Sequence, residues 1–345
     1  LIDDGRIELV VTGVIDENVH TRVEFGGPLL SNKGVNAPGV TLAVDSITDH
    51  DRAVMEWAVT ADVDFVGQSF VRSAADVHEL RALMAARPVP IVAKIEKFEV
   101  VSDLSAVIEA ADAVMVARGD LGVETSPEAV PVLQRRIIAE ARKAGKPVVV
   151  ATQMLDSMSA SPRPTRAEAS DVANAIFDRV DAVMLSGETA VGDYPLEAVE
   201  TMARIAAAAE DVVSGRGWDR AEARGRNVQE AVSAAVCDLA SGLRLAAIVP
   251  VTQSGATARA VARHRPDAPI AAATTQMSTA RQLNLVWGVR PVVVPFAHDT
   301  EELIDNVVAE MRDHAVALAG EQIAITAGRA ANAPGGTDFI LVRQV

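Results

Sequence analysis

A lysine and a glutamate stand two residues apart at the end of an apolar run, in Ala93-Lys94-Ile95-Glu96. Alternate side chains of a β-strand point to the same face, so Lys94 and Glu96 would share one face at the end of a strand. A cation and an anion placed in this way suit the binding of a charged substrate. An internal ion pair with no catalytic role explains these two residues equally well, and both interpretations stay open.

The next apolar run ends in a carboxylate between two glycines, in Arg118-Gly119-Asp120-Leu121-Gly122. Glycines let backbone N–H groups approach an anion closely, and Mg²⁺ binds a few carboxylates together with substrate oxygens. We therefore predict that Glu96 and Asp120, at the ends of adjacent strands, are ligands of a divalent metal. The alternative is that the glycine motif forms a plain turn.

Two further apolar runs also end in polar residues, the first in Thr152 and the second in Ser186-Gly187-Glu188-Thr189. A single threonine at a strand end is usually explained by β-branched packing. Four consecutive strands that deliver polar groups to one edge are harder to explain in that way. Such a set suits phosphoryl transfer, in which positioning and charge neutralisation supply nearly all of the catalysis.

The elements that would position these residues are five short apolar strands separated by helical patterns. The helical patterns include residues 76–86 and 128–144, and a third begins in a capping box at Thr165 and Glu168. Strands of this kind alternating with helices predict a parallel sheet, with active sites at the carboxyl ends of its strands. We predict a parallel (β/α) sheet, as in a (β/α) barrel, over residues 40–212, with strands at 64–71, 90–96, 113–118, 147–152 and 182–186.

The rest of the chain divides into three segments. Residues 1–39 read as short strands around 7–11 and 21–25, and the Gly- and Arg-rich residues 213–226 read as a linker. Strands and helices alternate again over 227–345, which predicts a second α/β sheet. Its expected strands are 246–251, 269–273, 291–294, 322–325 and 339–342.

The composition excludes several classes of protein. The chain has 345 residues, and 47 acidic against 32 basic residues give a formal net charge of −15, which argues against broad binding to nucleic acid or to an anionic membrane. One cysteine, Cys237, in an apolar helical pattern, cannot form an internal disulfide. No apolar run approaches the ~20 residues of a membrane span. We therefore expect a cytoplasmic protein.

The longest motifs resemble the pyruvate kinase family, in order and in spacing. The matching segments are 32–36, 69–72, 94–96, 115–124, 145–147, 151–155, 164–168, 170–175 and 184–190. The resemblance implies the transfer of a phosphoryl group from phosphoenolpyruvate to ADP, giving pyruvate and ATP in glycolysis. It also implies Mg²⁺ or Mn²⁺ as the divalent metal, K⁺ in the intact enzyme and a homotetramer.

The resemblance assigns roles to individual residues. Lys94 would contact the transferring phosphoryl group, and Glu96 and Asp120 would bind the metal. The backbone around Gly119 and Asp120 would hold the substrate carboxylate at a helix N-terminus. Thr152 would lie near the carbon that becomes protonated. Lys33, in a β lid domain over residues 1–39, would bind the nucleotide phosphates.

In the C-terminal domain, the resemblance suggests that a phosphorylated effector binds the loop containing Thr252, Ser254, Gly255 and Thr257. Hydroxyls and free N–H groups at a helix start suit an anion, although an ordinary Ser/Thr-rich helix cap explains the same residues. Arg329 and the loop 334–337 would face the same site.

Some positions depart from the family pattern. Lys97 follows Lys-Ile-Glu where an asparagine is usual, and Val191 follows Glu-Thr-Ala where a lysine is usual. A complete barrel of this family has eight strands, so the resemblance implies a partial (β/α)8 barrel over residues 40–212, with three strands and the K⁺ ligands missing from this chain. The chain would then begin within the lid.

Two other functions stay open. The first is another phosphoenolpyruvate or pyruvate barrel enzyme, which Lys33 and residues 227–345 argue against because such a barrel has neither a lid nor a second α/β domain. The second is a catalytically incomplete pyruvate kinase that only binds metal or effector.

Overall fold

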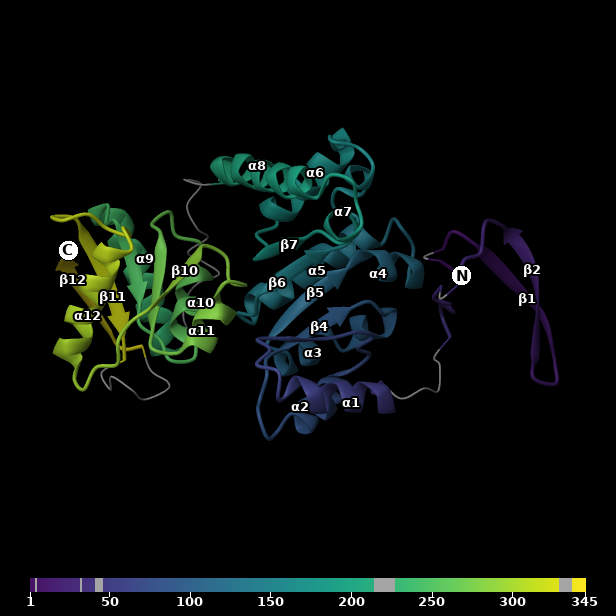
Figure 1. The fold of residues 1–345 in the computed structure, drawn as a ribbon, viewed down its shortest axis with the longest axis horizontal. Coiled ribbons are helices and arrows are strands. Elements are labelled where there is room, and N and C mark those ends of the chain that lie inside the picture. The colour runs from purple at the N-terminus through teal and green to yellow at the C-terminus, as the bar shows by residue number, and fades with distance from the viewer. Residues whose placement is uncertain (4, 32, 41–45, 214–226, 329–336) are drawn as a thin grey trace. The chain divides into compact units, whose positions relative to one another are not determined.

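The computed structural model describes residues 1–3, 5–31, 33–40, 46–213, 227–328 and 337–345. Its contacts divide the chain into two compact units (Figure 1). Unit 1 comprises residues 1–144, 148–179 and 183–205, and unit 2 comprises 145–147, 180–182 and 206–345. The expected linker lies outside the described residues, except Val213, which is the last residue of helix α8 (Pro195–Val213).

Unit 1 begins with an antiparallel hairpin. Its strands are β1 (Glu8–Ile15) and β2 (Asn18–Phe25), paired from Glu8 opposite Phe25 to Ile15 opposite Asn18. Both expected N-terminal strands are confirmed, and both extend further than the β-rich residues alone indicate.

The main sheet of unit 1 confirms all five expected strands. They are β3 (Val66–Gln68), β4 (Ile91–Ile95), β5 (Ala113–Ala117), β6 (Val148–Ala151) and β7 (Ala182–Met184). They lie in the order β3-β4-β5-β6-β7, and the ladders from β3 to β6 are parallel. Neighbours in sequence are therefore neighbours in space, as in a (β/α) barrel, but the described strands form an open sheet and no closed barrel. The carboxyl ends of β3, β4, β5 and β6 therefore lie along one edge.

The helices of unit 1 lie before and after the strands of its main sheet. They are α1 (Asp49–Ala58), α2 (Ala74–Leu83), α3 (Leu104–Ala110), α4 (Arg118–Glu124), α5 (Val130–Lys143), α6 (Arg166–Phe177), α7 (Gly187–Ala190) and residues 195–205 of α8. The capping box at the start of α6 is confirmed, because Thr165 accepts from the Glu168 amide and Glu168 accepts from the Thr165 amide.

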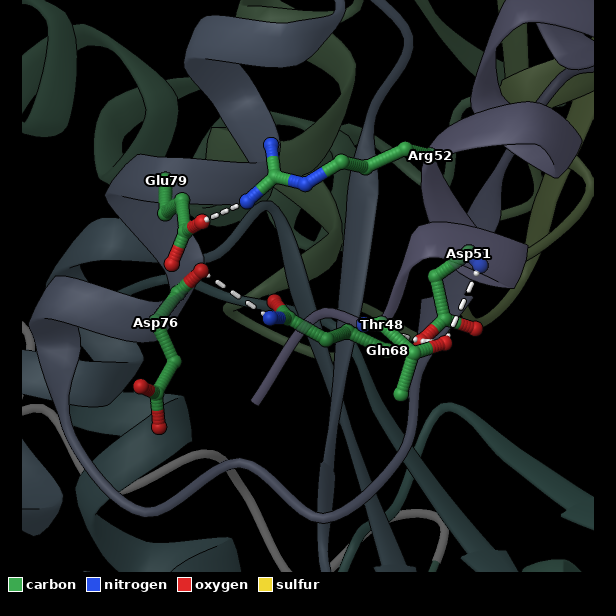
Figure 2. A network of polar contacts seen from close by, with 6 residues as sticks. All are labelled: Thr48, Asp51, Arg52, Gln68, Asp76 and Glu79. Atoms are coloured by element: carbon green, nitrogen blue, oxygen red, sulfur yellow. Dashed lines mark hydrogen bonds and ion pairs between the residues drawn. The ribbon is translucent and has the colours of Figure 1, made fainter. Parts of the chain in front are cut away.

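Helix α1 was not expected from the sequence, although it begins in a capping box of its own at Thr48 and Asp51. Its Arg52 Nη2 lies 2.7 Å from Glu79 Oε1 of α2 (Figure 2). The buried Gln68 of β3 donates from Nε2 to the Asp76 carbonyl of α2 over 2.9 Å (Figure 2). A polar side chain inside the sheet thus holds the helix that covers it.

Unit 2 is a second five-stranded sheet, as predicted. Its strands are β8 (Ala247–Pro250), β9 (Ile270–Thr274), β10 (Val289–Val293), β11 (Gln322–Ala327) and β12 (Phe339–Gln344). Its helices are α9 (Val228–Leu243), α10 (Ala256–Ala262), α11 (Met277–Leu283) and α12 (Thr300–Asp313). The strand order is β10-β9-β8-β11-β12, and only β12 runs antiparallel to its neighbour.

Alternation along the strands of unit 2 separates two apolar layers. Ile248 and Ala324 pack with α9, α10 and α11, including the buried Cys237. Val249 and Ile325, one residue further along, pack with α12 on the opposite face. The sheet is therefore covered on both faces, which explains its nearly continuous apolar strands. Among the helices that the structure describes, none is both long and apolar enough to cross a membrane.

We predict that His264 makes unit 2 sensitive to acid. His264 is 4 % exposed, and burial, reinforced by the charge of Arg263, lowers its pKa from 6.5 to about 4. The unfolded chain therefore binds more protons between these two pH values. The contribution of neutral His264 to the free energy of unfolding is fully present above pH 6.5 and is lost as the pH falls towards 4. From pH 7.5 to pH 5 the expected loss is about 2 kcal/mol.

The measurement is urea unfolding of the whole chain at the two pH values, followed by fluorescence. A His264→Gln variant controls for all other titrating groups, and it should lose about 2 kcal/mol less between the two values than the parent. Equal losses in the two proteins would contradict the assignment.

Candidate active site

The side chains of Lys94 and Glu96 meet at the carboxyl end of β4, as their spacing predicts. Lys94 Nζ lies 2.5 Å from Glu96 Oε1 and donates to Ser69 Oγ over 2.9 Å. The Glu96 side chain is 1 % exposed, whereas that of Lys94 is 27 % exposed. The pair therefore has a buried anion and a cation that reaches solvent, so the ammonium is the part that a ligand can meet.

The second oxygen of Glu96 is held by the loop that follows β3. The Phe70 amide donates to Glu96 Oε2 over 2.7 Å. Phe70 has a φ of 55°, in the left-handed region that non-glycine residues seldom adopt. A carboxylate offers about four lone-pair positions, so one ion pair at Oε1 and one hydrogen bond at Oε2 leave capacity for a metal ion. The chemistry of Glu96 fits a hard divalent cation.

The motif around Asp120 is helical rather than a plain turn. Residues 118–124 form α4, which begins directly after β5 and carries Asp120 in its first turn. A carboxylate in the first turn is favoured by the helix dipole. Because β4 and β5 are paired neighbours, Glu96 and Asp120 extend from adjacent strand ends. In the described part of the chain no three His, Cys, Asp or Glu side chains form a metal site, so a cation here would need ligand or solvent oxygens as well.

Thr152 lies at the end of β6 and is joined to α4. Its Oγ1 accepts from the Gly119 amide over 2.9 Å, and its carbonyl accepts from Arg118 Nη2 over 2.7 Å. Thr152 and Gln153 are consecutive left-handed residues, with φ of 69° and 56°. For a β-branched residue this conformation is a genuine outlier and costs about 1–3 kcal/mol. The contacts with α4 hold Thr152 in this strained state.

Further side chains fix the loops along the same edge. Arg118 Nη1 lies 2.5 Å from Asp171 Oδ2 of α6. Glu188, which is 2 % exposed, accepts from the Leu155 amide over 3.0 Å and from the Ser186 amide over 2.8 Å. The carboxylate of Glu188 therefore ties the loop after β6 to the loop after β7.

Glu168 fixes the loop after β6 in a similar way. It accepts from the Ser157 amide over 2.7 Å and from Ser157 Oγ over 2.6 Å. Burial acts to raise the pKa of Glu168, but the hydrogen bonds from Ser157 and Thr165 outweigh it and lower that pKa. These hydrogen bonds thus stabilise the ionised form of Glu168.

Lys33 lies at the base of the hairpin and is engaged there. Its Nζ lies 2.8 Å from Asp3 Oδ1, and the hydrogen bond from Lys33 lowers the pKa of Asp3. The structure thus pairs Lys33 within the N-terminal segment rather than with the strand-end residues of the sheet.

The candidate effector loop follows β8 in unit 2. Thr252 and Thr257 are buried, with 6 % and 8 % exposure, and Ser254 is exposed. Thr257 Oγ1 lies 2.8 Å from Thr337 Oγ1, and Gly255 has a φ of 80° as the N-cap of α10. The loop lies where the strand order reverses between β8 and β11, the usual ligand position of an open α/β sheet. Arg329 and residues 334–336 lie outside the described residues.

Sequence reasoning gave no role to several residues of this edge: Ser69, Phe70, Arg118, Glu124, Asp171 and Glu188. All of them lie within the segments that resemble the pyruvate kinase family, so the family pattern marks these positions without showing what they contact. Most of their bonds join residues 25 to 88 positions apart, which spacing along one strand does not show.

Comparisons with known proteins point to the same family along the whole chain. Residues 1–199 match the family model of the pyruvate kinase barrel domain, and residues 230–343 match that of the pyruvate kinase alpha/beta domain. The chain is 46 % identical to pyruvate kinase 2 of Synechocystis over 349 residues and 45 % identical to the pyruvate kinase of Geobacillus stearothermophilus over 352. Each match covers 100 % of this chain, but 59 % and 60 % of the relative. A pyruvate kinase of Clostridium acetobutylicum is 41 % identical, with 74 % of its length covered.

We predict opposite effects of alanine at two glycines of α4. A Cβ at Gly119 would lie 3.0 Å from Thr152 Oγ1, closer than ordinary contact, whereas a Cβ at Gly122 would meet Val130 Cγ2 at 3.4 Å. Gly122→Ala should be neutral or stabilise the chain by up to about 1 kcal/mol, because alanine favours helix. Gly119→Ala should destabilise it by about 1–2 kcal/mol, because the crowded threonine must move.

Chemical unfolding of the two variants and the parent measures both effects. Because the glycines lie in one helix, Gly122→Ala is a matched control for helix propensity. A Gly119→Ala variant as stable as Gly122→Ala would show that the approach of Thr152 is not a constraint.

Proposed function

The chain belongs to the pyruvate kinase family, and from this premise we propose that it performs phosphoryl transfer from phosphoenolpyruvate to ADP, giving pyruvate and ATP. The chain spans about 60 % of the length of the first two relatives compared above, so this activity is proposed for the protein of which these domains are part. The observation that carries the proposal is the contact between a solvent-reaching Lys94 and a buried Glu96 at the carboxyl end of β4.

Lys94 is the proposed catalytic cation. Its ammonium would lie against the phosphoryl group, and it would stabilise the negative charge that develops on the enolate oxygen as the phosphoryl group leaves. Glu96 and Ser69 hold the ammonium in place, so little reorganisation is needed when charge develops. This is the arrangement that phosphoryl transfer requires, since positioning and charge neutralisation do most of the work.

Thr152 and Gly119 are proposed to contact the substrate. The start of α4 suits a carboxylate, because its first backbone N–H groups point out of the helix and the dipole favours an anion there. The Gly119 amide is joined to the Thr152 hydroxyl over 2.9 Å. Thr152 would therefore sit beside the substrate carbon that takes up a proton when enolpyruvate becomes pyruvate.

Glu96 and Asp120 are the proposed protein ligands of Mg²⁺ or Mn²⁺. The bound cation would neutralise charge on the phosphoryl and carboxylate oxygens of the substrate. The family also implies K⁺ in the intact enzyme.

The proposal extends to the other segments of the chain. We propose a lid over residues 1–39, a catalytic domain over 40–212, a linker over 213–226 and a regulatory domain over 227–345. In the lid, Lys33 would leave Asp3 and bind the nucleotide phosphates.

In the regulatory domain, a phosphorylated effector would bind the loop that contains Thr252, Ser254, Gly255 and Thr257. The position of this loop at the reversal of strand order supports the proposal. We propose a cytoplasmic homotetramer for the intact enzyme.

A coupled assay of pyruvate formation tests the function. The purified 345-residue chain is mixed with phosphoenolpyruvate, ADP, Mg²⁺ and K⁺. Turnover would establish that the chain is catalytically competent. A folded chain without turnover would favour the alternative that it binds metal or effector only.

We predict that Lys94→Met abolishes most of the turnover while the fold persists. Removal of one preorganised charge donor costs at least about a hundredfold in rate. Circular dichroism serves as the control for folding, and methionine keeps most of the side-chain length. A variant with turnover comparable to that of the parent would remove the assigned role of Lys94.

We predict that Glu96→Gln and Asp120→Asn each weaken Mn²⁺ binding by at least about tenfold. Both changes keep the shape of the side chain and remove its charge. Titration of the chain with Mn²⁺, with free Mn²⁺ followed by electron paramagnetic resonance, gives the dissociation constants. If neither variant alters the titration, other carboxylates bind the metal.

A further inference from the structure

Glu124 is a buried carboxylate at an unfavourable position. It is the last residue of α4, and its side chain is only 4 % exposed. A negative charge at the end of a helix opposes the helix dipole, and burial of an unpaired charge is costly. Glu124 is neutralised by Lys97, whose Nζ lies 2.6 Å from Oε1, and Asn36 Nδ2 donates to the same oxygen over 3.0 Å.

Lys97 connects three parts of the candidate active site. It directly follows Glu96, and its side chain is only 16 % exposed. Its Nζ lies 5.8 Å from the centre of the Phe70 ring, within the range of a cation–π contact. Phe70 in turn holds Glu96 Oε2 through its amide, over 2.7 Å. One ammonium therefore touches the loop after β3 and the far end of α4.

We propose that the ion pair of Lys97 and Glu124 positions the two metal-binding carboxylates, Glu96 and Asp120. This inference rests on the metal site of the proposed function. Glu96 depends on the Phe70 loop, and Asp120 is carried by α4, so the two carboxylates belong to separate elements that the ion pair joins. Lys97 and Glu124 are positioning residues in this scheme and do not touch the substrate.

A purely electrostatic role of Lys97 and Glu124 makes a different prediction from a positioning role, so an experiment can distinguish the two roles. Loss of the Lys97 cation would by charge alone strengthen the binding of a metal cation nearby, and loss of the Glu124 anion would weaken it. A positioning role predicts that both losses weaken binding, because either one releases the same contact. The sign of the effect of Lys97→Met therefore distinguishes positioning from charge.

The experiment is Mn²⁺ titration of the whole chain, again with free Mn²⁺ followed by electron paramagnetic resonance. Lys97→Met and Glu124→Gln should each raise the dissociation constant about 10- to 100-fold, the usual effect of removing a partner behind a metal ligand. Lys97→Arg, which keeps the cation, should restore most of the affinity.

The matched control is Arg81→Met. It removes an ion pair of 2.8 Å with Asp112, which directly precedes β5 and so lies at the opposite edge of the same sheet. Mn²⁺ binding should not change in this variant. Circular dichroism checks every variant. If Lys97→Met does not fold, Lys97→Asn takes its place, because asparagine also removes the cation and is the usual residue of the family pattern at this position.

The outcomes separate this inference from the function on which it rests. Unchanged or tighter Mn²⁺ binding in Lys97→Met, together with weaker binding in Glu96→Gln, would overturn the positioning role alone. A parent chain that does not bind Mn²⁺, or a Glu96→Gln variant that binds it as the parent does, would overturn both. Weaker binding in Arg81→Met would show that any lost ion pair has this effect, and would also overturn the inference.

Discussion

The buried carboxylate of Glu96 is the constraint on which the arrangement of the site depends. At 1 % exposure it cannot remain charged without partners, because the loss of hydration must be offset by ion pairing and hydrogen bonds. Lys94 supplies the charge, and the Phe70 amide supplies the second bond. These two contacts fix the direction of the Lys94 ammonium and the conformation of the loop after β3, so that one buried anion organises two strand ends.

Three left-handed residues lie along the same edge of the sheet. Phe70, Thr152 and Gln153 are all left-handed, and each follows the end of a strand. Such conformations persist only where the surroundings determine them fully. For Phe70 the surroundings are the Glu96 carboxylate, and for Thr152 they are Gly119 and Arg118. The strained residues and the residues that hold them come from different strands, so the parallel sheet is the frame that brings them together.

Much of this frame could be predicted from the sequence, because periodicity and caps are local properties. The five strands of the first sheet, the five of the second and the capping box of α6 all follow from runs of a few residues. The side-by-side placement of Lys94 and Glu96 follows from strand alternation alone. Helix α4 was expected only from the family resemblance and not from its local pattern, because two glycines in its seven residues lower its intrinsic propensity and the contacts with Thr152 and α5 decide its conformation.

The supporting residues of the site could not be predicted in this way. Arg118 is joined to Asp171 of α6, and Glu188 holds the Leu155 amide, across separations of 53 and 33 residues. Nothing in the local pattern of a charged residue says which distant group will face it. A family resemblance shows that such residues recur in a motif, but only the fold shows which of them meet.

Two departures from the family pattern, at Val191 and Lys97, lie in different surroundings in the structure. Val191, in place of the usual lysine, is 85 % exposed after α7, and a single exposed apolar residue is ordinary on a protein surface. Lys97, in place of the usual asparagine, is largely buried and carries a full charge, which requires a counter-charge within reach. Glu124 meets that requirement at 2.6 Å. A charged residue beside Glu96, the proposed metal ligand, thus needs a counter-charge from another element of the fold. That counter-charge is Glu124, which joins Lys97 to α4, the helix that also carries Asp120.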